Sequence, residues 1–241
     1  MARTALVTGA SRGIGCAIAT RLQADGWRVV NFDILEPTPQ ADAAARWMKV
    51  DLADSQALVR GLADLINSEP IDALVNNAAI GLMAGLEHTT LADFERSVAI
   101  NMRAPMLCAQ AVLPAMKAQR WGRIINIASR AHLGKTERTA YAGTKGALVS
   151  MTKVWALELA RFGITCNAVA PGPIATELFT SANPPEMPRT RAIIDAIPMG
   201  RLGQPADIAN AVAFFVDERA GFITGQVLYV CGGVTLARGG S

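Results

Sequence analysis

The chain has 241 residues, of which 51% are hydrophobic and 18% are charged, and its formal net charge is +3. This composition excludes a disordered chain. The charge is too small to indicate a nucleic-acid binder, and no block rich in lysine and arginine is present. No apolar run approaches the length that a membrane span needs. We therefore expect neither nucleic acid nor a membrane as a partner.

Two further features bear on the cellular compartment. Glycines, beginning with Gly9, interrupt the N-terminal segment where a secretory signal would need an apolar run. The four cysteines form no CxxC pair and lie at no metal-ligand spacing from a histidine. We therefore expect free thiols, no metal site and a cytoplasmic protein.

Short apolar runs alternate along the chain with longer amphipathic runs. The apolar runs predict strands at residues 4–8, 28–32, 47–50, 72–75, 123–128, 164–170 and 226–230. The amphipathic runs predict helices at residues 13–25, 54–67, 91–119 (with a break inside), 140–161 and 206–216. This alternation predicts one doubly wound Rossmann-type α/β domain over residues 1–241, with a mainly parallel seven-stranded sheet and helices on both faces.

The segment from residue 177 to residue 203 differs from the rest in composition. Pro184, Pro185, Pro188 and Pro198 lie in it, and it has little strand pattern. We interpret it as a loop or short lid within the domain. Ligands of an open α/β sheet bind beyond the carboxyl ends of the strands, and this segment follows one of those ends. We therefore expect it to cover the substrate.

Glycines cluster in the turn after the first predicted strand, with the spacing G-x-x-x-G-x-G in Thr8-Gly9-Ala10-Ser11-Arg12-Gly13-Ile14-Gly15. Glycine permits a tight turn and lets a pyrophosphate approach the backbone. The following helix offers free N–H groups and the positive end of its dipole. Such a turn alone is a weak signal, but its place between a strand and a helix favours a dinucleotide site. Its expected contacts are Gly9, Ser11, Arg12, Gly13, Ile14 and Gly15.

Asp33 closes the second predicted strand and indicates which dinucleotide is bound. Its carboxylate can accept both hydroxyls of the adenosine ribose and would repel a 2′-phosphate, which favours NAD over NADP. Arg12 argues weakly for NADP, since a base in the glycine turn can hold that phosphate. No basic residue follows Asp33 directly, so we predict NAD. The alternative is that Asp33 only caps a loop.

Further cofactor contacts are expected where the third and fourth strands end. Asp51, followed by Leu52, could bond the adenine amino group through its side chain. The small residues of Asn77-Ala78-Ala79 would let the backbone run against the cofactor.

Ser129, Tyr141 and Lys145 form the candidate catalytic set. Positions 141 and 145 share one face of a predicted helix, so a phenol and an ammonium can converge there. A nearby cation stabilises phenolate and would lower the pKa of the tyrosine, which makes it usable as a general base. Ser129 ends a predicted strand, where its hydroxyl can hold a substrate oxygen. A lone Y-x-x-x-K pair is more often a surface pair, and the interpretation depends on the combination with the glycine turn.

Together these motifs resemble the short-chain dehydrogenase/reductase family, in its compact single-domain branch. The resemblance extends from Thr8 to about Gly233. It implies that Tyr141 is the acid/base, that Ser129 orients the substrate oxygen, and that Lys145 holds the nicotinamide ribose. The motifs that carry it are the glycine turn, Asn77-Ala78, Asn101, Ser129, Tyr141, Lys145 and Pro171-Gly172-Pro173-Ile174-Ala175-Thr176. The sequence departs from the family pattern at Ala79, where a glycine is usual, and in a slightly shorter interval between Ser129 and Tyr141.

The resemblance also assigns roles to Asn101 and to the turn after the sixth strand. Asn101 would position a water of a proton relay. In the turn, Ile174 would bond the nicotinamide carboxamide through its backbone, and Thr176 could reach the same end. Pro105 supports Asn101 independently, because its missing N–H frees the carbonyl of residue 101 and should kink the helix. The alternative is a packing kink without function.

The substrate is less well indicated by the sequence. A basic loop between the serine and the tyrosine could clamp a carboxylate, although a solvated loop is the simpler interpretation. Apolar residues suggest a pocket for a hydrophobic secondary alcohol or its ketone. The basic residues are Arg130, His132, Lys135 and Arg138, and the apolar residues are Met83, Leu178, Phe179 and Met187.

Three functions are compatible with this pattern. We favour an NAD-dependent secondary-alcohol dehydrogenase. A reductase of 3-oxoacyl groups or related ketones would use NADPH, against which Asp33 argues. A non-catalytic dinucleotide sensor is disfavoured by the intact set Asn101, Ser129, Tyr141 and Lys145. The resemblance also implies a homotetramer built partly on residues 104–117 and 147–162, whose faces are apolar, with a dimer as the alternative.

Overall fold

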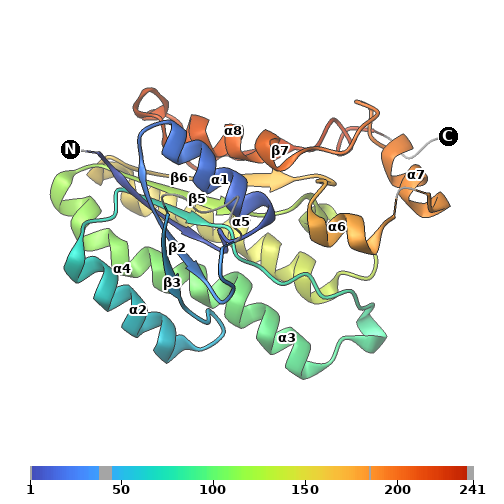
Figure 1. Cartoon of the computed structure of the whole chain (residues 1–241), viewed down its shortest axis with the longest axis horizontal. Helices are drawn as coiled ribbons and strands as arrows, with labels where there is room; N and C mark the ends of the chain where they lie inside the picture. The colour runs from blue at the N-terminus through green and yellow to red at the C-terminus, as the bar shows by residue number, and fades with distance from the viewer. Residues whose placement is uncertain (1, 38–44, 185, 238–241) are drawn as a thin grey trace.

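The computed structural model describes residues 2–37, 45–184 and 186–237. In the described part of the chain, one seven-stranded sheet has the order β3-β2-β1-β4-β5-β6-β7, and neighbouring strands pair in parallel (Figure 1). The strands are β1 Thr4–Thr8, β2 Arg28–Asp33, β3 Arg46–Lys49, β4 Ala73–Asn76, β5 Gly122–Ile127, β6 Ile164–Pro171 and β7 Val227–Val230. The predicted doubly wound sheet is confirmed, and the strand order reverses between β1 and β4.

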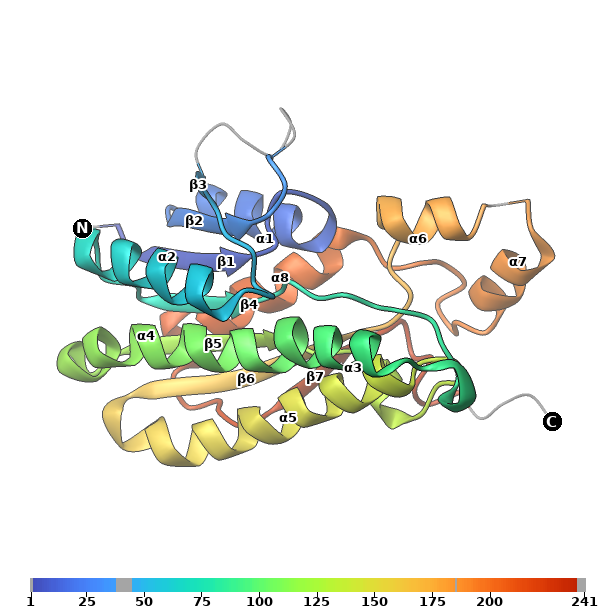
Figure 2. The ribbon, with the colours of Figure 1, turned by 90° about the horizontal axis from the view of Figure 1, so that it is seen from below.

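Helices cover both faces of this sheet (Figure 2). On one face α1 (Gly13–Ala24) and α8 (Pro205–Val216) pack together against the central strands. The other face is covered by α2 (Ser55–Ser68), α4 (Ala104–Gln119) and α5 (Thr139–Leu159). The predicted elements agree with these bounds to within a residue or two, except where a helix is interrupted.

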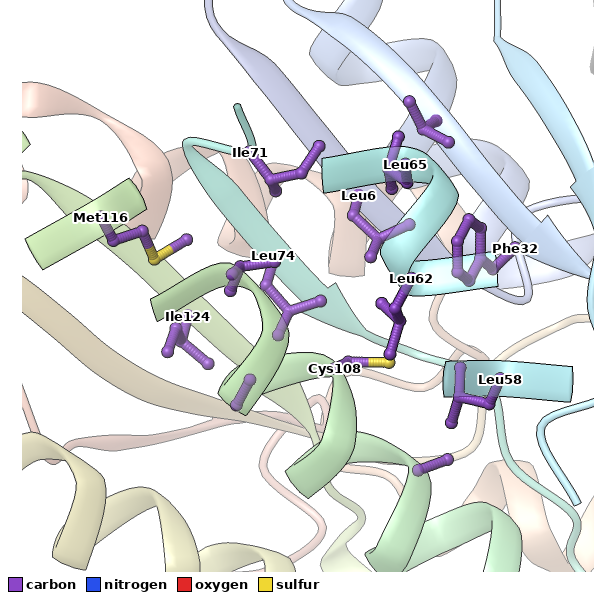
Figure 3. Packing of buried hydrophobic residues seen from close by; sticks show 14 of the residues in the cluster. Leu6, Phe32, Leu58, Leu62, Leu65, Ile71, Leu74, Cys108, Met116 and Ile124 are labelled. Atoms are coloured by element: carbon purple, nitrogen blue, oxygen red, sulfur yellow. The ribbon is translucent and has the colours of Figure 1, made fainter. Parts of the chain in front are cut away.

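The alternation of side chains along β1 directs them into two different hydrophobic clusters on opposite faces of the sheet. Leu6 belongs to the cluster under α2 and α4, whereas Ala5 and Val7 belong to the cluster under α1 and α8. A strand directs successive side chains to opposite faces, so a strand buried on both faces is apolar throughout. Figure 3 shows the first cluster, in which Leu58 of α2 and Cys108 of α4 are fully buried.

The predicted helix over residues 91–119 is broken, as expected. It consists of α3 (Leu91–Val98), a π-helical turn (Ala99–Arg103) and α4. In the π turn the N–H of Ala104 donates to the carbonyl of Ala99, five residues earlier. Such turns are rare in helices and occur often at functional sites, and this one contains Asn101.

The segment from residue 177 to residue 203, which we expected to be a loop or short lid, contains two short helices. These are α6 (Glu177–Ala182) and α7 (Pro188–Asp195). Thr176 caps α6 by accepting a hydrogen bond from the N–H of Phe179, and Pro188 opens α7, where its missing N–H costs nothing. Proline therefore starts a helix here, and Pro185 lies outside the described residues. Within the described residues, no helix has the length and apolar character of a membrane span.

Candidate active site

The parallel sheet gathers the predicted site residues at one edge. Because neighbouring strands run in the same direction, the residues after their carboxyl ends lie side by side. Figure 2 shows α6 and α7 beyond the edge toward which the strands point. The residues at this edge are the glycine turn after β1, Asp33 of β2, Asp51 and Leu52 after β3, Asn77-Ala78-Ala79 after β4, Ser129 after β5, and Pro171, Gly172, Ile174 and Thr176 at the end of β6 and after it.

The glycine turn has the backbone that only glycine adopts easily. Gly9 and Gly13 have φ values of +68° and +56°. A Cβ on Gly15 would collide with the carbonyl oxygen of Gly9, so the turn could not close on the start of α1. Above Gly13, the nearest atom to an added Cβ would be a methyl of Thr176, 3.5 Å away. Thr176 therefore lies in van der Waals range of this glycine.

The first turn of α1 fits an anionic group. Arg12 precedes the helix without a side-chain cap, and no acidic residue lies in the first turn. The leading N–H groups of the helix therefore have no capping side chain, and they point along the positive end of its dipole. The residues present fit the pyrophosphate of a dinucleotide, as the sequence predicted.

Two residues that the sequence analysis did not single out hold this turn from neighbouring strands. Thr8 accepts hydrogen bonds from the N–H groups of Asn77 and Ala78, both at 3.1 Å. Asn31, buried in β2, accepts from the N–H of Ala10 at 2.9 Å and donates to the hydroxyl of Ser11 at 2.9 Å. A polar residue in the middle of an apolar strand was the signal that could have identified Asn31.

Asn77 contributes through its side chain as well as through its backbone. Its amide donates to the carbonyls of Thr8 at 2.9 Å and Gly9 at 3.0 Å. The sequence analysis expected only small residues at this strand end. The amide instead ties the end of β4 to the glycine turn after β1, because the two strands are neighbours in the sheet.

Asp33 is fixed beside the glycine turn by two backbone donors. The N–H of Ser11 donates to one carboxylate oxygen and the N–H of Leu35 to the other, both at 3.0 Å. The Ser11 hydroxyl in turn donates to the carbonyl of Leu35 at 2.6 Å. Asp33 does cap a local turn through Leu35, as the alternative interpretation stated. Its bond with the N–H of Ser11 also holds the carboxylate beside the glycine turn. Asp51 is exposed, and one of its oxygens accepts from the N–H of Ala53.

Tyr141 and Ser129 meet at the centre of the site. Tyr141 lies in the first turn of α5, close enough to Ser129, which follows β5, for the serine hydroxyl to affect the pKa of the phenol. Ser129 accepts a hydrogen bond from the N–H of Ala131, at 3.2 Å, which orients its hydroxyl. Burial raises the pKa of Tyr141, and the Ser129 hydroxyl and the charge of Arg138 oppose that rise.

Lys145 lies beneath the tyrosine on the same helix face. Its ammonium is 5.8 Å from the centre of the Tyr141 ring and donates to the carbonyl of Ile127 at 2.6 Å. Burial lowers its pKa from 10.5 to about 7. We expected Lys145 to lower the pKa of Tyr141. The pKa of Tyr141 is raised instead, because burial disfavours the phenolate.

The side chain of Asn101 forms hydrogen bonds that the sequence did not reveal. Its buried side chain accepts from the N–H of Ile80 and donates to the Ile80 carbonyl and to the Thr144 hydroxyl, each at 3.0 Å. It thus joins the segment after β4 to α5, next to Lys145. These three bonds use both donors of the amide, so a water bound to Asn101 would have to donate to its Oδ1 or to its backbone carbonyl.

The turn after β6 is built on backbone bonds. The N–H of Ala175 donates to the carbonyl of Gly203 at 2.8 Å, and the N–H of Gly203 donates to Pro173 at 3.0 Å. The side chain of Ile174 is buried in the core, which leaves its backbone at the site. The apolar residues expected around a substrate pocket are partly open, with Met83 55% and Met187 45% exposed.

His132 lies among basic residues in the sequence, but its side chain contacts Tyr229 on the last strand. Its Nε2 is 2.8 Å from the hydroxyl of Tyr229 on β7, and the two rings stack. Burial, together with the charge of Lys153, lowers the pKa of His132. His132 therefore anchors the short 3-10 helix Arg130–Leu133 to the edge of the sheet.

Comparison with known proteins gives the same picture over the whole chain. A family model described as enoyl-(acyl carrier protein) reductase matches residues 9–235. The chain is 39% identical to a (2S)-[(R)-hydroxy(phenyl)methyl]succinyl-CoA dehydrogenase subunit of Thauera aromatica, with 98% of each chain covered. It is 36% identical to a 3-oxoacyl-[acyl-carrier-protein] reductase of Staphylococcus aureus, with 97% of this chain and 98% of the relative covered.

A solved structure extends the likeness to three dimensions. It is described as an NAD(P)-dependent gluconate 5-dehydrogenase of Beutenbergia cavernae with bound NADP. It shares 33% identity with this chain, each chain is covered to 97%, and the TM-score is 0.92.

Proposed function

The chain belongs to the short-chain dehydrogenase/reductase family of NAD(P)-dependent oxidoreductases, and we propose that it transfers a hydride between NAD and a secondary alcohol/ketone pair with Tyr141 as general acid/base. The observation that carries this proposal is the place of Tyr141 in the first turn of α5, near Ser129 and with the Nζ of the buried Lys145 5.8 Å from the centre of its ring. When bound, the nicotinamide ring supplies the carbon that accepts or donates the hydride.

Binding of the substrate oxygen, proton transfer and binding of the ribose are assigned to individual side chains. Ser129 holds the substrate oxygen, and its own orientation is set by the N–H of Ala131. In reduction Tyr141 donates its proton to the carbonyl oxygen, and its raised pKa keeps that proton in place until it is needed. In oxidation the phenol must lose its proton, and a protonated Lys145 beneath it favours the phenolate. Lys145 would also hold the nicotinamide ribose.

Mutation of the tyrosine tests this assignment directly. Tyr141→Phe should keep affinity for the dinucleotide and lose about a hundredfold to ten-thousandfold in kcat, the usual contribution of a general acid/base. The matched control is Tyr229→Phe, because the chain has only two tyrosines and the hydroxyl of Tyr229 contacts His132 rather than Ser129. Its kcat should change by only a few fold. A near-normal kcat in Tyr141→Phe would remove Tyr141 from the role.

We propose NAD rather than NADP as the preferred cofactor. The carboxylate of Asp33 is held rigidly beside the glycine turn, where it can accept the ribose hydroxyls and repel a 2′-phosphate. The other expected contacts are Gly9, Ser11, Arg12, Gly13, Ile14, Gly15, Asp51, Leu52, Asn77, Ala78, Ala79, Pro171, Gly172, Ile174 and Thr176.

A 3-oxoacyl reductase that uses NADPH is the second candidate. The Staphylococcus aureus relative and the NADP in the Beutenbergia cavernae structure favour it. Asp33→Ala separates the two, because removing the carboxylate should weaken NAD and improve NADP, and so reduce the NAD/NADP ratio of kcat/KM by about tenfold or more. A ratio that stays the same would refute the role of Asp33. A wild-type preference for NADPH would support the second candidate.

We also propose a homotetramer, with the outer faces of α4 and α5 as one interface. Large apolar side chains are exposed there, with Met106 37%, Val154 50% and Leu157 85% exposed. Clustered exposed apolar residues of this size indicate an interaction surface.

A further inference from the structure

One fully buried asparagine stands in an apolar strand next to the proposed cofactor site. Asn31 is 1% exposed and lies in β2 between Val30 and Phe32. Successive side chains of a strand point to opposite faces of the sheet, so Asn31 and Asp33, two positions apart, share a face. Val29 shares it too and belongs to the cluster under α1 and α8, so this face is the one that α1 covers. A buried amide at such a position is costly unless its polar atoms have partners.

Asn31 finds partners for both of its polar atoms in the glycine turn after β1. Its side-chain oxygen accepts a hydrogen bond from the N–H of Ala10, and its side-chain nitrogen donates to the hydroxyl of Ser11, both at 2.9 Å. An ionised carboxylate only accepts, and an apolar side chain does neither. The amide therefore matches two adjacent groups of the turn, one donor and one acceptor.

The bond from Asn31 sets the direction of the Ser11 hydroxyl. Ser11 is fully buried, and its hydroxyl donates to the carbonyl of Leu35 at 2.6 Å. A hydroxyl has one hydrogen, and the N–H of Asn31 already faces its oxygen, so the hydrogen is directed away from Asn31 and toward Leu35. The hydroxyl thus links the glycine turn to the residues that follow β2.

Asp33 is held by the two residues that this hydroxyl joins. The backbone N–H groups of Ser11 and Leu35 each donate to one oxygen of its carboxylate, both at 3.0 Å. Without Asn31 the Ser11 hydroxyl would be free to rotate, and the link between Ser11 and Leu35 would weaken. The carboxylate of Asp33 would then move more freely relative to the glycine turn.

We propose that Asn31 is a positioning residue for cofactor selection, which acts through Ser11 and Leu35 to hold the carboxylate of Asp33 where it meets the adenosine ribose. This inference rests on the proposed preference for NAD. A fixed carboxylate both accepts the ribose hydroxyls and repels a 2′-phosphate, so Asn31 should affect the discrimination between the two dinucleotides. A general weakening of the glycine turn would instead affect both dinucleotides alike.

Calorimetric titration of NAD and of NADP into the wild type and Asn31→Ala tests this proposal. We define the selectivity as the Kd for NADP divided by the Kd for NAD. It should fall about twofold to tenfold in Asn31→Ala, the usual effect of losing one hydrogen bond. An equal loss of affinity for both dinucleotides would give Asn31 a structural role only and would overturn the proposal. Binding needs no alcohol or ketone, so the result does not depend on the substrate.

Asn167→Ala is the matched control. Asn167 is also 1% exposed and lies inside a strand, β6, where its side chain donates to the carbonyl of Ile223 at 2.8 Å and accepts from the N–H of Gln226 at 3.0 Å. These partners precede β7, at the edge of the sheet opposite the glycine turn. The control removes a similar pair of buried bonds and should leave the selectivity unchanged. A fall as large as in Asn31→Ala would assign the effect to lost stability and overturn the proposal.

Ser11→Ala tests the same network from its middle, and it keeps the proposal testable if Asn31→Ala does not fold. This variant keeps the N–H that bonds Asp33 and removes the hydroxyl between Asn31 and Leu35. It should lower the selectivity by a similar factor. The double variant with Asn31→Ala should fall little further, because both substitutions break one network. Fully additive effects, or an unchanged selectivity in Ser11→Ala, would contradict the route through Ser11.

Asp33→Ala separates failure of this inference from failure of the proposed cofactor preference. In that background Asn31→Ala should not change the selectivity further, because the carboxylate that it positions is gone; a further change would overturn the inference. If Asp33→Ala lowers the selectivity and Asn31→Ala does not, the preference for NAD stands and the role of Asn31 is wrong. If neither lowers it, the role of Asp33 fails, and that of Asn31 fails with it.

Discussion

Asn101→Ala should destabilise the protein by about 3 kcal/mol, a value that follows from the bonds of this side chain. The substitution leaves the N–H and the carbonyl of Ile80 without partners. An unsatisfied buried polar group costs about 1–3 kcal/mol, and Ile80 is half-buried, which places each group toward the lower part of that range. Thr144 loses less, because its hydroxyl still donates to the carbonyl of Tyr141 at 2.9 Å.

Urea unfolding measures this effect, with Asn210→Ala as the control. Asn210 is an exposed helical asparagine whose side chain bonds only Arg21, so its loss should change the free energy of unfolding by less than about 0.5 kcal/mol. We also expect a lower kcat in Asn101→Ala, because the segment at Ile80 and Gly81 packs on the Tyr141 ring. A stability loss below about 1 kcal/mol would refute the bracing role that we assign to Asn101.

Two further predictions concern a buried charge and an exposed apolar residue. Lys145 has a pKa of about 7 in the folded chain and 10.5 otherwise, so the unfolded chain binds more protons between those values and wild-type stability should rise with pH there. Lys145→Met should lack that rise, and near neutral pH it should be more stable than the wild type by on the order of a few kcal/mol. The carbonyl of Ile127, which loses its partner in this variant, should offset part of the gain. Urea unfolding of both proteins at about pH 6 and about pH 10 measures the difference. If the proposed tetramer forms through α5, Leu157→Glu should lower the mass measured by light scattering, whereas Leu86→Glu, at an exposed position outside α4 and α5, should not. An unchanged mass for Leu157→Glu would exclude α5 from the interface.

The sequence alone was sufficient for the sheet. The apolar runs that predicted strands form strands because a strand buried on both faces needs apolar side chains at successive positions, whichever elements cover it. The predicted break in the helix over residues 91–119 became a π turn, since Pro105 cannot donate a helical hydrogen bond. Parallel pairing then brings Gly9, Asp33 and Ser129 to one edge.

Local patterns predicted less well the features that depend on distant partners. Proline content indicated a loop at residues 177–203, but helix starts tolerate proline, and α7 begins at Pro188. His132 was grouped with its basic neighbours in sequence, yet it pairs with Tyr229 on the last strand.

What the sequence determined by itself was the fold class and the family, because both follow from periodicity and from the order of motifs along the chain. Only the tertiary structure decided how the proposed site residues are tuned and braced. The pKa of Lys145 depends on its burial on the inner face of α5, and the orientation of Asn101 depends on Ile80 and Thr144. Burial and proximity between distant segments are properties of the packed chain, so no local pattern contains them.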